Sequence, residues 1–146
     1  MEAIYIGFKG ERNSAYQTVS RLSGDKLFLT NSIGGLTREI AALDKPHKTA
    51  VLFGLDKRIK SGVRIESCAV KNGEFLFSAL DITSVAEKLR RNGVESVTGK
   101  SPFPSLCNEA YWLALEKYGG NAVFLHLPSI RRMTEEMMIG IRNALE

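Results

Sequence analysis

Apolar and polar residues alternate along the chain in blocks that predict strands and helices in turn. Runs that are almost wholly apolar predict three buried strands, at residues 3–8, 49–55 and 122–127. Weaker patterns predict strands at 27–29, 62–70, 75–77 and 94–97, the third of which either continues or pairs with the second. Apolar residues at helical spacing, with capping and stop residues, predict helices at 14–22, 32–43, 82–92, 105–118 and 134–145.

This order of elements predicts the fold class. Strands that alternate with helices of about a dozen residues are typical of an α/β domain. We therefore expect a single-domain three-layer α/β/α sandwich with a mostly parallel or mixed twisted sheet. Because the chain has no internal repeat, low-complexity tract or linker, we expect one domain over residues 1–146.

The strand ends predict where chemistry would take place. In α/β folds the active site lies beyond the carboxyl ends of the strands. Gly54 and His126 stand at the ends of the two most apolar runs, and Cys107 follows a separate connection. We expect these three segments to converge.

Composition narrows the class of protein. With 44% hydrophobic and 25% charged residues, the chain resembles an ordinary soluble globular protein. No apolar run approaches the roughly 18 residues that cross a bilayer, and the opening MEAIYIGF lacks the pattern of a signal peptide. We expect a cytoplasmic protein without a membrane partner.

The net charge of +4 does not by itself indicate nucleic-acid binding. The basic residues are dispersed, and no aromatic ladder is interleaved with the densest groups, at 57–60, 90–91 and 131–132. We interpret these groups as solvated helix ends and loops, and we expect no nucleic-acid partner.

Cysteine and histidine are scarce, which limits the chemistry. The chain has two cysteines, Cys68 and Cys107, and two histidines, His47 and His126. Their spacing matches no zinc motif, and two cysteines do not make a disulfide scaffold at this length. We expect no metal and no cofactor, and any thiol–imidazole chemistry must use one of four residue pairs.

Cys107 lies in the first turn of a predicted helix. Two prolines precede Ser105, and the helical pattern begins directly after them. Free backbone N–H groups and the positive end of the helix dipole favour a thiolate there, which predicts a lowered pKa. The same N–H groups can donate to an oxyanion beside the sulfur. A cysteine in this position can equally be a small core residue.

His126 and Glu66 are the candidates to assist such a thiol. His126 ends the run AVFLHL before Pro128, where its ring can reach the start of a neighbouring helix, although a histidine between leucines is often a hydrogen-bonded core residue. A third group must then orient the imidazole. Period-two alternation places Arg64, Glu66 and Cys68 on one face of a strand, so Glu66 is either this orienting carboxylate or a solvated surface residue.

Four segments occur in the order found in one known family. They are VLFGL (51–55), VRIESCAV (63–70), SLCNEAYWLAL (105–115) and FLHLPS (124–129). In this order they resemble the signature blocks of pyroglutamyl peptidase I, the pyrrolidone-carboxylate peptidases, which read as an apolar strand ending in GL, then VERVAIN, TFVCNxxxY and a strand ending in HVP. The opening IGF (6–8) and the stretch FSALDITSVAEKLRRNGV (77–94) resemble further blocks, so the resemblance spans the whole chain.

The resemblance implies an activity and a set of residues. Members of the family remove an N-terminal 5-oxoproline from peptides with a Glu–Cys–His triad, which maps onto Glu66, Cys107 and His126. It therefore implies a cysteine hydrolase acting on a small peptide or amide, and a homo-oligomer, as members often form. As the apolar wall for the acyl group we expect Phe8 and Leu106, with Phe103 in place of the family's phenylalanine two residues before the nucleophile.

The chain also departs from the family pattern. It keeps Phe8 but lacks the second aromatic residue of the opening loop. Between Val70 and Phe77 it is short, where the family carries a polar insertion with an arginine associated with the oxyanion site. Three alternatives to pyroglutamyl hydrolysis therefore stay open: a catalytically retired relative that binds a small ligand or protein, a cysteine hydrolase for another amide or ester, and a redox role for Cys68 with Cys107.

Overall fold

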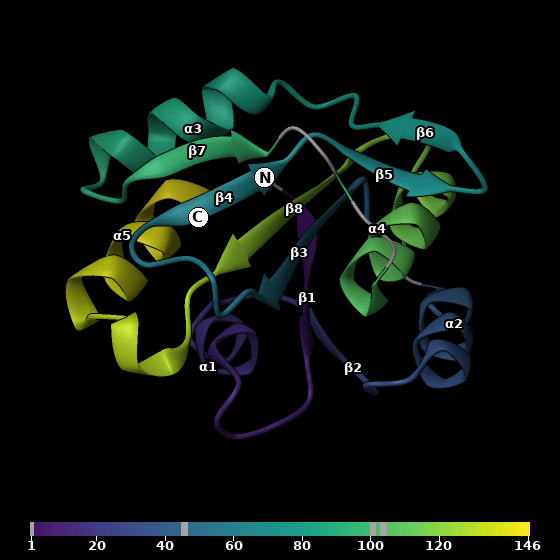
Figure 1. The fold of residues 1–146 in the computed structure, drawn as a ribbon, viewed down its shortest axis with the longest axis horizontal. Coiled ribbons are helices and arrows are strands. Elements are labelled where there is room, and N and C mark those ends of the chain that lie inside the picture. Colours follow the sequence, from purple (N-terminus) through teal and green to yellow (C-terminus); the bar gives the residue numbers. More distant parts are fainter. Residues whose placement is uncertain (1, 45–46, 100–101, 103–104) are drawn as a thin grey trace.

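The computed structural model describes residues 2–44, 47–99, 102 and 105–146. Its centre is a sheet in the order β2-β1-β3-β8-β4-β7 (Figure 1). The four strands β2, β1, β3 and β8 run parallel to one another, whereas β4 runs antiparallel to β8 and parallel to β7. The bounds of the sheet strands are β1 (Ala3–Phe8), β2 (Lys26–Leu29), β3 (Thr49–Leu55), β4 (Val63–Glu66), β7 (Ser96–Gly99) and β8 (Ala122–Leu127).

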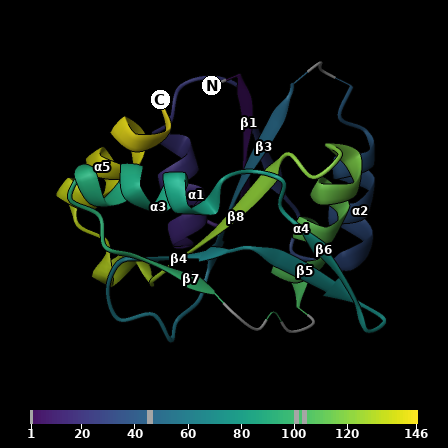
Figure 2. The same ribbon diagram turned by 90° about the horizontal axis from the view of Figure 1, so that it is seen from above.

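Helices cover both faces of the sheet, as Figure 2 shows in a view from above. One face packs against α1 (Ser14–Ser20), α3 (Ile82–Arg91) and α5 (Glu135–Leu145), and the other against α2 (Ile33–Ala41) and α4 (Leu106–Lys117). The inner strands β1, β3 and β8 are almost fully buried. Their apolar side chains extend from both faces of the sheet and pack against the helices on each side. The predicted α/β/α sandwich with a mixed sheet is confirmed.

The stretch 62–70, predicted as one strand, is divided in two. β4 ends at Glu66, and β5 (Cys68–Lys71) leaves the main sheet to pair antiparallel with β6 (Glu74–Phe77) in a separate hairpin. The hairpin turns at Asn72 and Gly73, both with positive φ. The sequence does not reveal this break, because apolar and polar residues alternate without interruption from β4 into β5. The break matters because it leaves Glu66 at the end of β4, where its backbone carbonyl accepts a hydrogen bond from Tyr111 of α4.

Helix α4, which carries Cys107, begins directly after the serine that caps it. The Ser105 side chain accepts a hydrogen bond from the Asn108 backbone N–H at 3.1 Å, so α4 starts at Leu106. Between β8 and α5 lies a short 3₁₀ turn, η1 (Ile130–Arg132). Within the described residues, no helix has the length and apolar character needed to cross a bilayer.

Candidate active site

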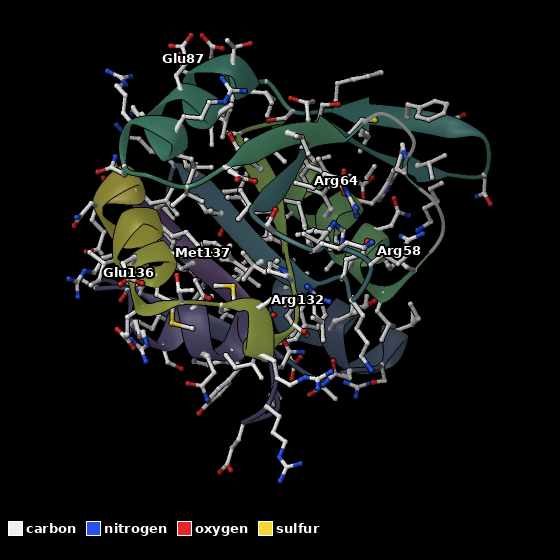
Figure 3. All side chains as sticks on the ribbon, turned by 60° about the vertical axis from the view of Figure 1, so that its left-hand side comes forward. Arg58, Arg64, Glu87, Arg132, Glu136 and Met137 are labelled. Atoms are coloured by element: carbon white, nitrogen blue, oxygen red, sulfur yellow. The ribbon has the colours of Figure 1, made fainter. Side chains whose placement is uncertain are left out.

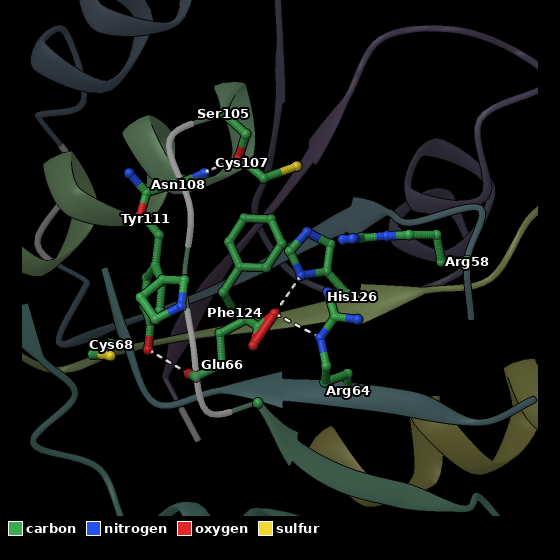
Figure 4. Close-up of a pocket in the computed structure, with 12 residues that line it drawn as sticks. Arg58, Arg64, Glu66, Cys68, Ser105, Cys107, Asn108, Tyr111, Phe124 and His126 are labelled. Carbon is green, nitrogen blue, oxygen red and sulfur yellow. Dashed lines mark hydrogen bonds and ion pairs between the residues drawn. The ribbon is translucent and has the colours of Figure 1, made fainter. Parts of the chain in front are cut away.

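A pocket of about 470 Å³ lies where the carboxyl ends of β3 and β8 meet the end of β4 and the start of α4. Cys107, His126 and Glu66 all line it (Figure 4). Gly54 and His126 are directly opposite each other in the ladder between β3 and β8, and Arg64 is opposite His126 on the other side. The expected convergence of Gly54, Cys107 and His126 is therefore confirmed.

His126 is held in place by a carboxylate. Its Nδ1 lies 2.8 Å from Oε2 of Glu66, and both side chains are largely buried. The other ring nitrogen faces the side on which the Cys107 sulfur lies (Figure 4). A hydrogen bond between Nδ1 and a carboxylate places the proton on Nδ1, and it leaves Nε2 as the acceptor. Nε2 is thus the ring nitrogen on the side of the thiol, and within the described residues no hydrogen bond joins the Cys107 and His126 side chains.

Glu66 stays ionised because of its partners. Burial by itself raises the pKa of its carboxyl, but the hydrogen bonds from His126 and Arg64 outweigh burial and bring the pKa below its ordinary value. Arg64 Nε donates to the same Oε2 at 2.9 Å. The absence of a side chain at Gly99 makes room for this carboxylate, because a Cβ there would collide with Oε1 of Glu66.

A second carboxylate completes this charge network. Asp56, directly after β3, accepts from Nη2 of Arg64 at 2.7 Å and from Nε and Nη2 of Arg58 at 3.0 and 2.9 Å. The hydrogen bonds from Arg58 outweigh the effect of burial, and those from Arg64 act in the same direction, so the pKa of Asp56 is far below its usual range. Two arginines and two carboxylates thus surround His126, and no sequence pattern pointed to Asp56 or Arg58.

Cys107 lies in the first turn of α4, as predicted, but its pKa is not lowered. Burial of the thiol raises its pKa to about 12, with Asp56 and Glu66 acting in the same direction and Arg64 against them. The sequence-based expectation of a helix-stabilised thiolate is therefore wrong. Two nearby carboxylates and the loss of water outweigh the helix dipole, whose effect is small and short-ranged. These surroundings favour the thiol over the thiolate.

The sulfur of Cys107 lies directly over the backbone of β3. A Cβ added to Gly54 would stand 2.6 Å from the Cys107 sulfur and 2.6 Å from Cζ of Phe124. Any side chain at this position would therefore push the thiol or the ring aside. The φ of Gly54 is not positive, so its backbone conformation does not require glycine. The close approach of the sulfur and the ring does.

This contact predicts that Gly54→Ala impairs the site. We expect the sulfur to shift by several tenths of an ångström or more and kcat/KM to fall about 100-fold, which is the usual cost of misplacing a reacting group by about 1 Å. The free energy of unfolding should fall by about 1–3 kcal/mol from overpacking. Steady-state kinetics and chemical denaturation measure the two effects.

Gly34→Ala is the matched control. Gly34 is an exposed residue of α2, and its new Cβ would meet only the flexible end of Arg38, at 3.3 Å. We expect unchanged activity and a small gain in stability, of about 0.5–1 kcal/mol, because alanine favours the helix. Full activity in Gly54→Ala would contradict the placement of the sulfur over β3.

Aromatic rings form one wall of the pocket, and they are not the ones expected. Phe124 packs against His126 with ring centres 4.7 Å apart and against Tyr111 at 5.7 Å. Two signals in the sequence could have found them. Phe124 is two residues before His126 on the same strand face, and Tyr111 is four residues after Cys107 on the same helix face.

Of the three apolar side chains that were predicted to form the wall, Phe8 and Leu106 do not line the pocket. Phe8 ends β1 only 3% exposed in the core between the sheet and the α2–α4 layer, and it is not a lining residue of the pocket. Leu106 is half-buried against the same core and does not line the pocket either. Around the axis of α4, the side chain of Leu106 points about a third of a turn away from the direction of the Cys107 side chain. Phe103 lies outside the described residues.

Two further side chains fix the parts of the site to one another. The amide of Asn108 pairs with the backbone of Val70 in β5, accepting from its N–H at 2.9 Å and donating to its carbonyl at 2.7 Å. The Tyr111 hydroxyl donates to the backbone carbonyl of Glu66 at 2.7 Å. The start of α4 is thereby tied both to the hairpin and to the end of β4. In the sequence, Asn108 was indicated only by the Cys-Asn pair that it shares with the family block TFVCNxxxY.

The second thiol is placed differently. Cys68 lies at the start of β5, 7% exposed, and burial raises its pKa as well. It lines the pocket, but Figure 4 shows its sulfur on the far side of Tyr111 from Cys107. Both cysteines are free thiols.

These groups define a class of site. A thiol at a helix start, an imidazole whose Nδ1 is bound by a carboxylate, and a pocket beside them are what a Cys–His–acid hydrolase requires. The part of the chain that the structure describes holds no cluster of three or more histidine, cysteine or acidic side chains placed to bind a metal ion.

The fold is that of the pyrrolidone carboxyl peptidases. The chain superimposes on the enzyme from Thermus thermophilus with a TM-score of 0.82, 20% sequence identity, and coverage of 99% of this chain and 98% of that one. The pyroglutamyl peptidase I of Bacillus amyloliquefaciens matches with a TM-score of 0.78 at 14% identity, covering 99% and 97%. A point variant of the Pyrococcus furiosus enzyme matches with a TM-score of 0.77 at 21% identity, covering 99% and 96%.

The likeness is one of structure, at low sequence identity. No family model matches the chain, and no curated protein matches it by sequence. The resemblance that the sequence blocks suggested is thus confirmed at the level of the fold, which these solved structures share over nearly their whole length.

Proposed function

We propose that this protein is a cysteine hydrolase of the pyroglutamyl-peptidase type, which removes an N-terminal pyroglutamyl or related small acyl group from a peptide or amide. The observation that carries the proposal is the pocket itself. Its lining includes Cys107 and the pair formed by His126 and Glu66, whose Nδ1 and Oε2 atoms are 2.8 Å apart, and the fold is shared with pyrrolidone carboxyl peptidases. Cys107 is the nucleophile, His126 the general base and acid, and Glu66 the group that orients the imidazole.

The reaction follows from these positions. His126 Nε2 takes the proton of the Cys107 thiol as the sulfur attacks the carbonyl carbon, and the carbonyl oxygen gains the negative charge. The backbone N–H of Cys107, which has no acceptor within the first turn of the helix, donates to this oxyanion. When the C–N bond breaks, His126 returns the proton to the leaving amine. Water then attacks the thioester with His126 again as base, and the acid and the free thiol are released.

The raised pKa of Cys107 fits general-base catalysis. A thiol with a pKa of about 12 carries almost no thiolate at neutral pH, so proton transfer to His126 has to accompany attack. Glu66 supports this transfer, because a nearby carboxylate stabilises the imidazolium that forms. A buried thiol is also shielded from unspecific oxidants and alkylating agents.

The pocket suits a small, flat acyl group. The rings of Phe124 and Tyr111 form a wall beside the thiol, which favours a five-membered lactam through packing and apolar contact. A pocket of about 470 Å³ holds a residue-sized group with room for the peptide that follows it.

A panel of aminocoumarin substrates tests the proposal. We expect the pyroglutamyl derivative to release the fluorophore, and the prolyl and glutamyl derivatives to react at least about 100-fold more slowly, since the pocket would lose a lactam contact or gain an unpaired charge. Release from another acyl group would move the assignment to a different amide hydrolase. No release from any derivative, with a correctly folded protein, would support the retired relative.

A further inference from the structure

Two segments that follow strands of the site carry a concentration of positive charge, and one of their residues, Arg58, lines the pocket. The loop after β3 contains Lys57, Arg58 and Lys60, and the turn after β8 contains Arg131 and Arg132, all of them exposed. We call these five side chains the basic rim. Both segments follow the strands whose carboxyl ends form the site.

The two segments lie against each other. The Asp56 backbone N–H donates to the Leu127 carbonyl at 2.8 Å, and Nη1 of Arg132 donates to the Lys60 carbonyl at 3.5 Å. Arg58 lines the pocket itself. Figure 3 shows Arg58, Arg64 and Arg132 on the same side of the molecule. The two charged segments, far apart along the chain, are therefore neighbours in space, and Arg58 brings their charge to the edge of the pocket.

The rim carries five positive charges, against which stand the carboxylates of Asp56, of Glu66 in the pocket lining, and of Glu95, which accepts from the Ser61 hydroxyl at 3.0 Å. Asp56 is the one acidic residue in the stretches 56–62 and 128–133, and its side chain is only 9% exposed and engaged by two arginines. Glu135, which follows the second segment, pairs with Arg21 on α1. Within the described residues, Lys57, Lys60 and Arg131 have no ion-pair partner. The entrance is thus electropositive, and an anion that approaches it is attracted over several ångströms.

The position of the rim relative to the catalytic groups indicates which part of a substrate meets it. The aromatic wall, with Tyr111, lies on one side of His126, and Arg58 lies on the other (Figure 4). In the proposed reaction His126 protonates the leaving amine, so the leaving group lies on the histidine side, toward Arg58. The acyl group then occupies the apolar side.

We propose that the basic rim selects substrates whose leaving group is anionic, namely short peptides with an acidic residue or a free carboxylate directly after the scissile bond. This inference rests on the proposed function, because it assigns the leaving-group side from the role of His126. A polyanion such as single-stranded nucleic acid is the less suitable occupant. The two rim segments contain no aromatic residue on which bases could stack.

Three matched peptides test the selection, pyroglutamyl-Glu-Ala, pyroglutamyl-Gln-Ala and pyroglutamyl-Lys-Ala. At about 20 mM salt we expect kcat/KM for the Glu peptide to exceed that for the Lys peptide about tenfold, with the Gln peptide between them. At about 0.5 M salt the ratio should shrink to about twofold, because the Debye length falls to a few ångströms.

Charge reversal identifies the residues responsible. We expect the double variant Lys57→Glu/Lys60→Glu to lose the preference or invert it. The control Lys88→Glu/Arg91→Glu makes the same change in net charge at exposed positions of α3, outside the rim, and should keep the preference. Equal salt-sensitive loss in both double variants would overturn the proposal, because it would assign the effect to net charge alone.

A binding experiment separates this inference from the proposed function. The affinities of the three peptides for the Cys107→Ser protein, measured by calorimetry, need no turnover. Tighter binding of the Glu peptide supports the rim even if no peptide is hydrolysed, an outcome that would count against the hydrolase alone. Equal affinity for the Glu and Lys peptides overturns the inference, whether or not the peptides are hydrolysed. Displacement of the bound Glu peptide by an oligonucleotide at a concentration lower than that of the peptide also overturns it.

Discussion

Replacing Cys107 with alanine should lower kcat/KM toward a pyroglutamyl substrate by about 10⁴-fold or more while the fold is retained. Removal of a catalytic nucleophile leaves only binding and oxyanion stabilisation, which give a small residual rate. The side chain is half-buried and small, so the free energy of unfolding should change by no more than about 1–2 kcal/mol. Steady-state kinetics together with circular dichroism and thermal unfolding measure both quantities.

Cys68→Ala provides the comparison with the other thiol. Cys68 is more deeply buried than Cys107, and it lies on the far side of Tyr111 in the same pocket. We expect its replacement to lower activity less than about tenfold, through packing alone. Comparable losses in the two variants would contradict the assignment of Cys107 as nucleophile, and retained activity in Cys107→Ala would exclude it.

Replacing His126 with alanine should lower kcat/KM about 1,000-fold near neutral pH and change the pH dependence. General acid–base catalysis contributes about 10²- to 10⁴-fold. Without the base, the reaction depends on thiolate formed by loss of the proton to solvent. Because the pKa of Cys107 is raised to about 12, chiefly by burial and next by Asp56 and Glu66, the thiolate fraction is small at neutral pH and rises as pH increases.

The sign of the pH effect makes this prediction specific. Below the thiol pKa, each unit of pH raises the thiolate fraction about tenfold, so the residual rate of His126→Ala should climb about 100-fold from about pH 7 to about pH 9. His47→Ala is the control, since His47 pairs with Asp25 in a separate pocket. We expect it to keep the activity and pH profile of the unmodified protein. A flat profile in His126→Ala would contradict general-base catalysis by His126.

Much of the fold is determined by local sequence pattern. The apolar runs 49–55 and 122–127 are central strands because residues on both of their faces must leave water. The helices predicted at 32–43, 82–92, 105–118 and 134–145 begin within one residue of those starts, with Ser32, Asp81, Ser105 and Thr134 as their N-caps. The pairing of strands is not local. Nothing in 62–70 indicates that the chain leaves the sheet after Glu66, since a break at Ser67 does not disturb the alternation.

The residues of the candidate site divide in the same way, into those that the sequence indicates and those that it does not. Cys107, His126 and Glu66 could be chosen from sequence because few cysteines and histidines compete, and because their order resembles a known family. The network of Asp56, Arg58 and Arg64 could not, since ion pairs form between segments whose spatial neighbourhood the pattern does not encode. For that reason the direction of the Cys107 pKa was predicted wrongly: a helix start is visible in sequence, whereas burial and neighbouring carboxylates are not.

Local pattern is therefore enough to predict the α/β architecture and the helix on which Cys107 lies, and the family resemblance adds Glu66 and His126. Contacts between distant segments establish that Glu66 reaches His126, that Gly54 leaves room for the sulfur, and that Phe124 and Tyr111 rather than Phe8 and Leu106 line the pocket. The same contacts place the segment after β3 against the turn after β8, with Arg58 in the lining of the pocket. The physical reason is range: hydrophobic periodicity and capping act within a few residues, whereas a site is made by contacts between strands and helices distant in the chain.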